Sequence, residues 1–272
     1  MSLLLMMRKP RVAERYIHLG SEDVWTSLIF ERLRLLPAEF LRRIVNQAVG
    51  REAILADELD EEWIEYRCWE KLEPPRERSP QGRSDDQFTP SFLSQKSRSP
   101  KEGNTEADVW VQLGNRARRN RFETLILIEM KLYSPPSSGT SYDPGRHQML
   151  RNADVLWVMA EQMGSQRIFC LLWDMQYAAD SMILKMTSPE FLRSKLPERG
   201  KSRLTFEEVA RNVGWVNYRQ VREVVAGLGP RQMSRAEKAL AKDLLWLLDD
   251  LLQRSATQET LFELDRSMDQ LS

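Results

Sequence analysis

Residues 125–132 place an acid and a base directly after a run of aliphatic side chains, and no other segment constrains the fold as strongly. Residues 125–128 are all leucine or isoleucine, which is typical of a β-strand buried on both faces. Glu129 and Lys131 follow two positions apart, so they point to the same face of that strand. Burial of charge is costly unless the charges are paired or bind a ligand. The segment therefore indicates either an ion pair at the end of a core strand or a functional site.

The composition supports a globular chain with a substantial hydrophobic core. Of its 272 residues 42% are hydrophobic, enough for one large domain or two small ones. Forty basic residues balance forty acidic ones, so contact with nucleic acid needs a local basic patch. Cys68 and Cys170 lie far apart in the sequence and do not indicate a disulfide framework. With only His18 and His147 in addition, a zinc cluster of cysteine and histidine is excluded.

The N-terminus lacks the order of basic and apolar residues that a signal peptide needs. A few apolar residues come first, and Arg8 and Lys9 follow them. No uninterrupted apolar stretch approaches the roughly 20 residues that span a bilayer. We therefore expect a cytoplasmic protein with no membrane partner.

Two helices and a polar loop are predicted in the first part of the chain. Residues 21–43 have helical periodicity, and Pro37 is expected to break the helix, so that a second one covers residues 38–49. Residues 60–69 are compatible with helix or strand. Residues 73–104 contain five prolines among polar residues and predict a long, largely mobile loop.

The middle of the chain predicts a β-hairpin followed by a helix and a further strand. Residues 107–113 alternate apolar and polar side chains, and residues 122–133 form the second strand of the hairpin. A helix is expected from about residue 146 to 163 and a buried strand at 167–174. Residues 181–185 are a candidate for one more strand.

The last third predicts helices that pack on this core. Residues 205–213 and 218–227 resemble a helix–turn–helix pair, for which packing is favoured over a role in binding. Residues 234–253 predict a long helix with a leucine seam typical of helix bundles. We therefore divide the chain into a core of residues 1–200, which includes the loop, and a helical extension of residues 201–272 packed on it.

The hairpin brings two carboxylates together. If its strands pair about a turn near Arg118, Asp108 lies opposite Ile128 or Glu129, with Cβ atoms roughly 4.5–5.5 Å apart for directly opposed residues. Two carboxylates that close repel unless one is protonated or a cation lies between them. Mg²⁺ is commonly held by one or two carboxylates together with water and phosphate. Asp108 and Glu129 therefore predict a magnesium site, with Lys131 beside the reacting water or phosphate.

This arrangement resembles the PD-(D/E)XK nuclease superfamily, which has the restriction-endonuclease-like fold. The family pattern is an acid at the start of one strand and acid-x-Lys in the next. It is matched by Asp108 and by Glu129 and Lys131, although the proline that often precedes the first acid is absent here. The resemblance covers roughly residues 20–175 and gives no account of the C-terminal helices.

Two further features of the family have counterparts in this sequence. Many members carry Gln-x-x-Arg on the helix after the second strand, and Gln148 and Arg151 match it. A further acid from an N-terminal helix commonly completes the metal site. Glu22 is our choice for that acid, with Asp23 and Glu31 as rivals.

The resemblance implies an α/β fold in which a central mixed β-sheet is flanked by helices, with additional C-terminal helices. It also implies a metal-dependent nuclease that uses Mg²⁺ or Mn²⁺. Lys131 would position the attacking water, and Gln148 would orient the lysine or contact the substrate backbone. The metal ligands that the resemblance implies are Asp108, Glu129, the backbone carbonyl of Met130, and Glu22.

DNA is the expected substrate because most relatives cut DNA, and restriction or phage defence is the expected context by analogy alone. The resemblance also admits a homodimer, since many enzymes of this fold cut both strands as dimers. Phosphate contacts are expected from Arg151 and from the tip of the hairpin, whose arginines are Arg116, Arg118, Arg119 and Arg121. Such a tip is equally typical of a solvated turn.

Other interpretations stay open. Glu22 and Asp23 are also explained as acids favoured in the first turn of a helix, and His147 is interpreted as a surface histidine rather than a general base. A nucleic-acid-binding or protein-interaction module on the same fold, without catalysis, is one rival. A helical adaptor that works through the seam at 234–252 is another.

Overall fold

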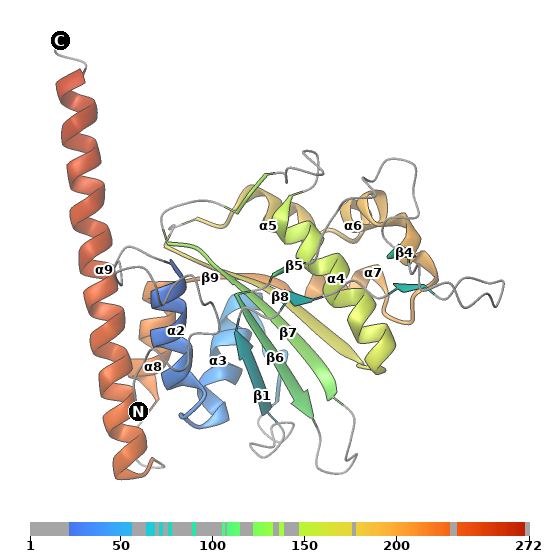
Figure 1. The fold of residues 1–272 in the computed structure, drawn as a ribbon, viewed down its shortest axis with the longest axis horizontal. Coiled ribbons are helices and arrows are strands. Elements are labelled where there is room, and N and C mark those ends of the chain that lie inside the picture. Colours follow the sequence, from blue (N-terminus) through green and yellow to red (C-terminus); the bar gives the residue numbers. More distant parts are fainter. Residues whose placement is uncertain are drawn as a thin grey trace.

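A five-stranded mixed β-sheet forms the centre of the protein, seen in a computed structural model (Figure 1). Its strands, in the spatial order β1-β6-β7-β8-β9, are β1 Ile64–Cys68, β6 Val109–Gly114, β7 Phe122–Met130, β8 Arg167–Asp174 and β9 Val213–Asn217. The structure describes residues 22–55, 64–68, 71–72, 76–77, 89–90, 105–106, 108–114, 122–132, 136–138, 147–175, 178–228 and 233–269.

The sheet is antiparallel at one side and parallel at the other. β1 pairs antiparallel with β6 and β6 with β7, whereas β7, β8 and β9 run parallel. Parallel neighbours need long crossovers. The first crossover contains helix α4 (Gln148–Met163), and the second contains several short helices. The prediction of an α/β chain with a mixed sheet flanked by helices is confirmed at this level.

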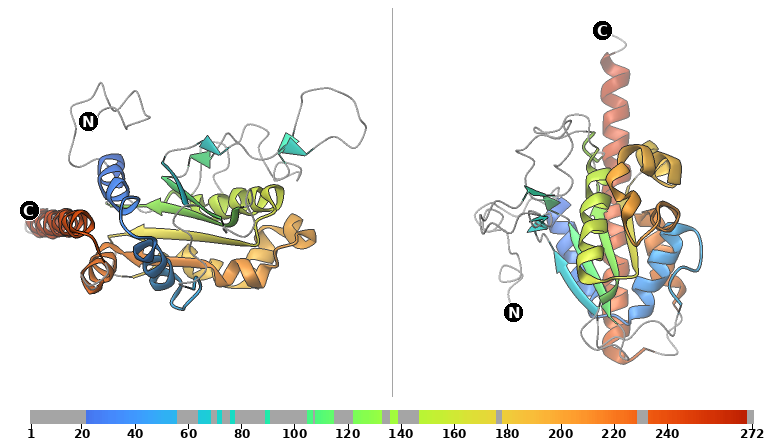
Figure 2. Two further views of the ribbon diagram at one scale, coloured as in Figure 1. Left: turned by 90° about the horizontal axis from the view of Figure 1, so that it is seen from below. Right: turned by 90° about the vertical axis from the view of Figure 1, so that its right-hand side faces the viewer.

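Helices cover both faces of the sheet (Figure 2). One face is packed by α2 (Glu22–Leu33), α3 (Ala38–Val49), α8 (Tyr218–Gly227) and α9 (Arg235–Asp269). The other face is packed by α4, α5 (Ser181–Met186), α6 (Pro189–Lys195) and α7 (Phe206–Arg211), and the 3₁₀ helix η6 (Pro197–Lys201) connects the last two. Strand β7 therefore needs apolar side chains on both sides.

Alternation along β7 fixes which face each of its side chains meets. Ile126 and Ile128 belong to the core formed with α2 and α3, whereas Leu125 and Leu127 belong to the core formed with α4. Because successive side chains of a strand point to opposite faces, Glu129 lies on the α4 face. This placement determines which helix can supply partners for its carboxylate.

The predicted break in the N-terminal helical segment is confirmed, and the assignment left open at residues 60–69 is resolved. The helical segment breaks at Pro37 into α2 and α3, and the ambiguous residues 60–69 contain strand β1. The predicted loop at 73–104 contains two short strands, β3 (Arg76–Glu77) and β4 (Thr89–Pro90), which pair with each other. Its other residues lie outside the described ranges. A second short pair joins β2 (Lys71–Leu72) to β5 (Thr105–Glu106).

Two predictions for the C-terminal part are wrong. Residues 181–185 lie in helix α5 rather than a strand, because Asp180 caps it by accepting a hydrogen bond from the Met182 N–H. Residues 205–227 are not a helix–turn–helix pair, since strand β9 separates α7 from α8 and joins the sheet beside β8. The segment 201–272 is therefore not purely helical.

Helix α9 packs through its leucine seam on the protein's own core. Leu244, Leu248 and Leu251 are fully buried there, beside α2 and α8. Ion pairs of Arg32 with Asp243 and of Arg222 with Asp249 add contacts to both helices. Toward its C-terminus the helix extends past the rest of the ribbon (Figure 1). None of the helices in the described ranges has the length and apolar character needed to cross a membrane.

The contact between β9 and α3 predicts a large effect of adding one methyl group. A Cβ atom at Gly214 would lie 2.6 Å from the carbonyl oxygen of Ala48, a backbone atom that cannot rotate away. We expect Gly214→Ala to lower the free energy of unfolding by about 1–3 kcal/mol in urea titrations, as in other overpacked cores.

Gly227→Ala is the matched control, because a Cβ there meets nothing within 4 Å at the end of α8. We expect this variant to change stability by less than about 1 kcal/mol. Equal destabilisation by the two substitutions would contradict the view that Gly214 is needed for the close approach of β9 to α3.

Candidate active site

The carboxylate of Glu129 is buried at the end of β7 and is surrounded by donors. The residue is only 1% exposed. Its Oε1 lies 2.8 Å from Lys131 Nζ and accepts a hydrogen bond of 2.6 Å from Gln148 Nε2. Its Oε2 accepts a hydrogen bond of 3.0 Å from Asn152 Nδ2. Three donors thus compensate one buried negative charge, as burial in a core requires.

Helix α4 supplies two of these donors because of where it begins. His147 caps the helix, and its Nδ1 accepts a hydrogen bond from the Met149 N–H. Gln148 and Asn152 are then four residues apart on one face, one above the other, and both reach Glu129. Gln148 is held further by backbone: its Oε1 accepts from the Ser137 N–H, which leaves its amide NH₂ directed at Glu129.

Lys131 bridges the acids of two elements. Its Nζ lies 2.8 Å from Glu129 Oε1 and 3.5 Å from Glu22 Oε2, and its side chain is mostly buried. Burial acts to lower the pKa of Lys131, but the negative charges of Glu129, Asp108 and Glu22 outweigh it and raise the pKa above the ordinary value. Lys131 is therefore an ammonium ion at neutral pH.

Asp108 joins the site from the neighbouring strand. Val109 is opposite Ile128, so the next position of the register sets Asp108 across from Glu129, as the hairpin pairing predicted. Asp108 Oδ2 accepts a hydrogen bond of 2.8 Å from the Met130 N–H. Burial, followed by the negative charge of Glu129, raises the pKa of Asp108 well above its ordinary value, against the opposing effect of Lys131.

The first turn of α2 brings further acids to the same place. Glu22 Oε1 accepts a hydrogen bond of 3.1 Å from the Leu132 N–H, directly after β7. Asp23 is close enough for its charge to contribute to the raised pKa of Asp108. Glu31, two turns later, instead pairs with Arg34. Of the three acids considered from the sequence, Glu22 makes the direct contacts.

The carboxylate oxygens at this site suit a hard cation, but they are arranged around a lysine. Asp108 and Glu129 offer carboxylate oxygens, the ligands that Mg²⁺ and Mn²⁺ prefer, and their mutual repulsion is the kind that a cation relieves. Among the residues that the structure describes, no group of three or more histidine, cysteine or acidic side chains is placed to hold a metal. A metal at Glu129 would therefore have to share that carboxylate with Lys131, Gln148 and Asn152.

Asn152 is the site residue that sequence interpretation missed. The family pattern draws attention to Arg151, which lies on α4 and is partly buried, but it is Asn152 that donates to Glu129. The four-residue spacing from Gln148 was the available signal. The hairpin-tip arginines Arg116, Arg118, Arg119 and Arg121 lie outside the described residues.

Removal of the Asn152 amide is expected to destabilise the protein. Asn152→Ala leaves Glu129 Oε2 without its donor in a buried position, which should lower the free energy of unfolding by about 1–3 kcal/mol. Asn152→Asp should cost more at neutral pH, because it sets a second carboxylate against Glu129, and part of the loss should return on acidification. Urea titrations at neutral and mildly acidic pH measure both effects.

The control for these variants is Gln47→Ala, on the exposed side of α3, which should leave stability nearly unchanged. If Asn152→Asp proved as stable as the wild type at neutral pH, the hydrogen bond to Glu129 would not be what holds this side chain.

The raised pKa of Asp108 predicts a pH-dependent loss of stability. In the unfolded chain the carboxyl loses its proton near its ordinary pKa of about 4, whereas the folded protein retains the proton to higher pH. The folded state therefore binds more protons in this window, and the free energy of unfolding falls as pH rises, by at most about 1.4 kcal/mol per pH unit.

Asp108→Asn tests this because it keeps an oxygen acceptor for the Met130 N–H and does not titrate. Urea titrations of both proteins from about pH 4 to about pH 7 should show the wild type losing stability relative to the variant as pH rises. Parallel stability curves would contradict the raised pKa.

No protein-family model, curated protein or solved structure matches the chain. The contacts of Glu129, Lys131 and Asp108 and the resemblance of their sequence pattern are therefore the basis for inferring a function.

Proposed function

We propose that the chain is a metal-dependent nuclease of the PD-(D/E)XK type with a restriction-endonuclease-like fold. The observation that carries this proposal is the meeting of Asp108 and Glu129 at the end of adjacent strands, with Lys131 Nζ 2.8 Å from Glu129 Oε1. The proposed substrate is a phosphodiester of DNA. A role in restriction or phage defence is an analogy with that family.

Mg²⁺ or Mn²⁺ would be held by Asp108 and Glu129, with the carbonyl of Met130 and the carboxylate of Glu22 as further ligands. Such an ion acidifies a bound water and shields the charge of a phosphate. Both carboxylates must be ionised to bind it. Because the pKa of Asp108 is raised, activity should increase as pH rises through the titration of Asp108.

Lys131 acts as a cationic donor in this proposal rather than as a base. Its raised pKa keeps the ammonium protonated at neutral pH, so it cannot accept a proton from the attacking water. An ammonium at this position orients the water and stabilises the negative charge that develops on the phosphate. Glu22 and Glu129 hold the ammonium from two sides.

Gln148 and Asn152 act as positioning residues. They hold the two oxygens of Glu129, Gln148 through Oε1 and Asn152 through Oε2, and thereby fix the plane of its carboxylate. A fixed plane keeps Glu129 Oε1 beside Lys131 without a reorganisation cost during the reaction.

The rival is a nucleic-acid-binding or protein-interaction module without catalysis. It is favoured by the contacts of Glu129, whose two oxygens already accept hydrogen bonds from Gln148 and Asn152 and form an ion pair with Lys131. A buried ion pair with satisfied hydrogen bonds is also a stable structural feature. Metal binding separates the two candidates, because only the nuclease requires Glu129 to accept a cation.

The experiment is cleavage of plasmid DNA with Mg²⁺ or Mn²⁺ by the wild type, Lys131→Ala and Asp108→Ala. Each substitution should lower the rate by about 100-fold or more, the usual effect of removing a group that stabilises the transition state. Lys185→Ala is the matched control, an exposed lysine on α5 that should leave the rate unchanged.

Titration of the wild type and Asp108→Asn with Mn²⁺ gives the second readout. Heat of binding that disappears in Asp108→Asn supports the metal site. Bound DNA with no metal heat and no cleavage would instead support the non-catalytic module, and equal cleavage by Lys131→Ala and the wild type would refute the nuclease proposal.

A further inference from the structure

A second charged region lies at the opposite end of strand β8. Arg167 is the first residue of this eight-residue strand. The other end of β8 adjoins the candidate active site, where the Lys131 N–H donates to the carbonyl of Trp173. At roughly 3.3 Å per residue, the two ends are about 20 Å apart. Arg167 therefore belongs to a region separate from Glu129 and Lys131.

Three arginines from distant parts of the chain line one cavity at this end. The cavity has a volume of about 250 Å³, and Arg51, Arg167 and Arg211 all border it. Arg51 follows Gly50, whose positive φ of 67° ends α3 in a left-handed C-cap. Arg211 is the last residue of α7. The fold thus gathers guanidinium groups from a loop, a strand and a helix end.

The contacts of two of these arginines, Arg51 and Arg211, do not neutralise their charge. The third, Arg167, donates through Nη1 to the carbonyl oxygen of Ala53. Arg51 Nη2 donates to the neutral amide oxygen of Asn212, and neither Arg51 nor Arg211 has a carboxylate partner within the described ranges. The acid that lines the cavity is Glu208, and its Oε2 already accepts from the backbone N–H and hydroxyl of Thr205 in the capping box of α7.

The electrostatics of Arg51 agree with the proximity of the three guanidinium groups. Burial, followed by the positive charges of Arg211 and Arg167, lowers the pKa of the Arg51 guanidinium. Like charges that repel across a cavity are stabilised when an anion enters it.

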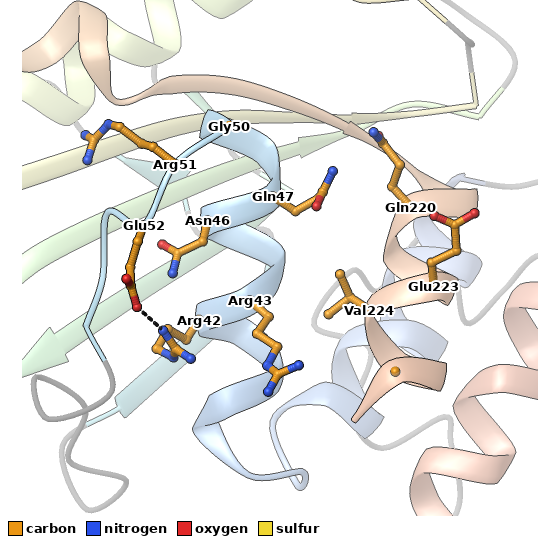
Figure 3. A pocket seen from close by; sticks show the side chains of 11 residues that line it. Arg42, Arg43, Asn46, Gln47, Gly50, Arg51, Glu52, Gln220, Glu223 and Val224 are labelled. Carbon is orange, nitrogen blue, oxygen red and sulfur yellow. Dashed lines mark hydrogen bonds and ion pairs between the residues drawn. The ribbon is translucent and has the colours of Figure 1, made fainter. Parts of the chain in front are cut away.

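A larger groove on the other side of Arg51 has a different character. This groove, of about 680 Å³, lies between α3 and α8. Its Arg42 is paired with Glu39 and Glu52. Figure 3 shows Arg51 directed away from Glu223, which lies across the groove on α8. The groove thus mixes both signs of charge, and the smaller cavity is the better candidate for an anion.

We propose that the cavity lined by Arg51, Arg167 and Arg211 binds a phosphate group. Guanidinium groups form bidentate, charge-assisted hydrogen bonds with phosphate oxygens, and three of them converge here. The cavity is smaller than the usual pocket for a drug-sized ligand, which is about 300–1,000 Å³, so its size suits a phosphate or diphosphate. The phosphate comes from a small phosphorylated molecule or from a nucleic-acid backbone.

The test is calorimetric titration of the full-length protein with inorganic phosphate and with pyrophosphate, at constant ionic strength set by chloride. Saturable binding by the wild type is expected. In Arg51→Gln/Arg211→Gln the affinity should fall by about tenfold or more, because two charge-assisted contacts are lost while each glutamine keeps a donor. Arg211→Gln alone, at an exposed position, should show a smaller loss in the same direction.

Arg254→Gln is the charge-matched control, since Arg254 lies on α9 and pairs with Asp250 there. It should bind pyrophosphate as the wild type does. Absence of saturable binding by the wild type, or equal affinity of the double variant and Arg254→Gln, would overturn the proposal.

Competition distinguishes the two sources of the phosphate. Displacement of pyrophosphate by a nucleoside diphosphate but not by a short DNA duplex identifies a small-molecule site, and displacement by the duplex identifies a backbone contact. Lys131→Ala should retain phosphate binding, so failure of the nuclease proposal and failure of this one give different results.

Discussion

The ion pair between Glu129 and Lys131 is the interaction on which the candidate site depends. Strand β7 is the middle strand of the sheet and is buried on both faces, so a carboxylate in it needs compensation by neighbouring groups. Lys131 supplies the charge, and Gln148 and Asn152 supply the remaining hydrogen bonds. An unpaired Glu129 would be costly to bury, whereas with these partners its carboxylate is held in one orientation.

The site draws on four segments, of which β7 and α4 supply the groups that compensate the charge of Glu129. Glu129 and Lys131 lie at the end of β7, Asp108 directly precedes β6, and the first turn of α2 brings Glu22. Helix α4 packs on the same sheet face as Glu129 because it crosses from β7 to the parallel strand β8. The topology of the mixed sheet and the chemistry of the site are therefore linked: an antiparallel neighbour supplies a second acid, and a crossover helix supplies neutral donors.

Sequence alone predicted the parts that depend on local pattern. Pairing of the hairpin strands about a turn near Arg118 predicted Asp108 opposite Ile128 or Glu129, and the register favours Glu129. Pro37 divided the first two helices correctly. Strand β9 was missed because its five residues lie between two helical segments and are stabilised by pairing with β8, some forty residues earlier in the chain. The role of Asn152 was missed for a similar reason, since its amide reaches Glu129 only when α4 lies against β7.

The net charge is zero, but the fold separates acidic and basic side chains into different regions. Forty acidic and forty basic residues cancel in sum, yet acids converge at one end of β8 and arginines line a cavity at the other. A polyanion responds to such local fields within about a Debye length, roughly 8–10 Å, rather than to the total. The separation of about 20 Å corresponds to about six nucleotide steps of 3.4 Å along one DNA strand. A single phosphate group therefore cannot contact both regions, so the phosphate binding proposed for the cavity and the chemistry proposed for Glu129 can be tested separately.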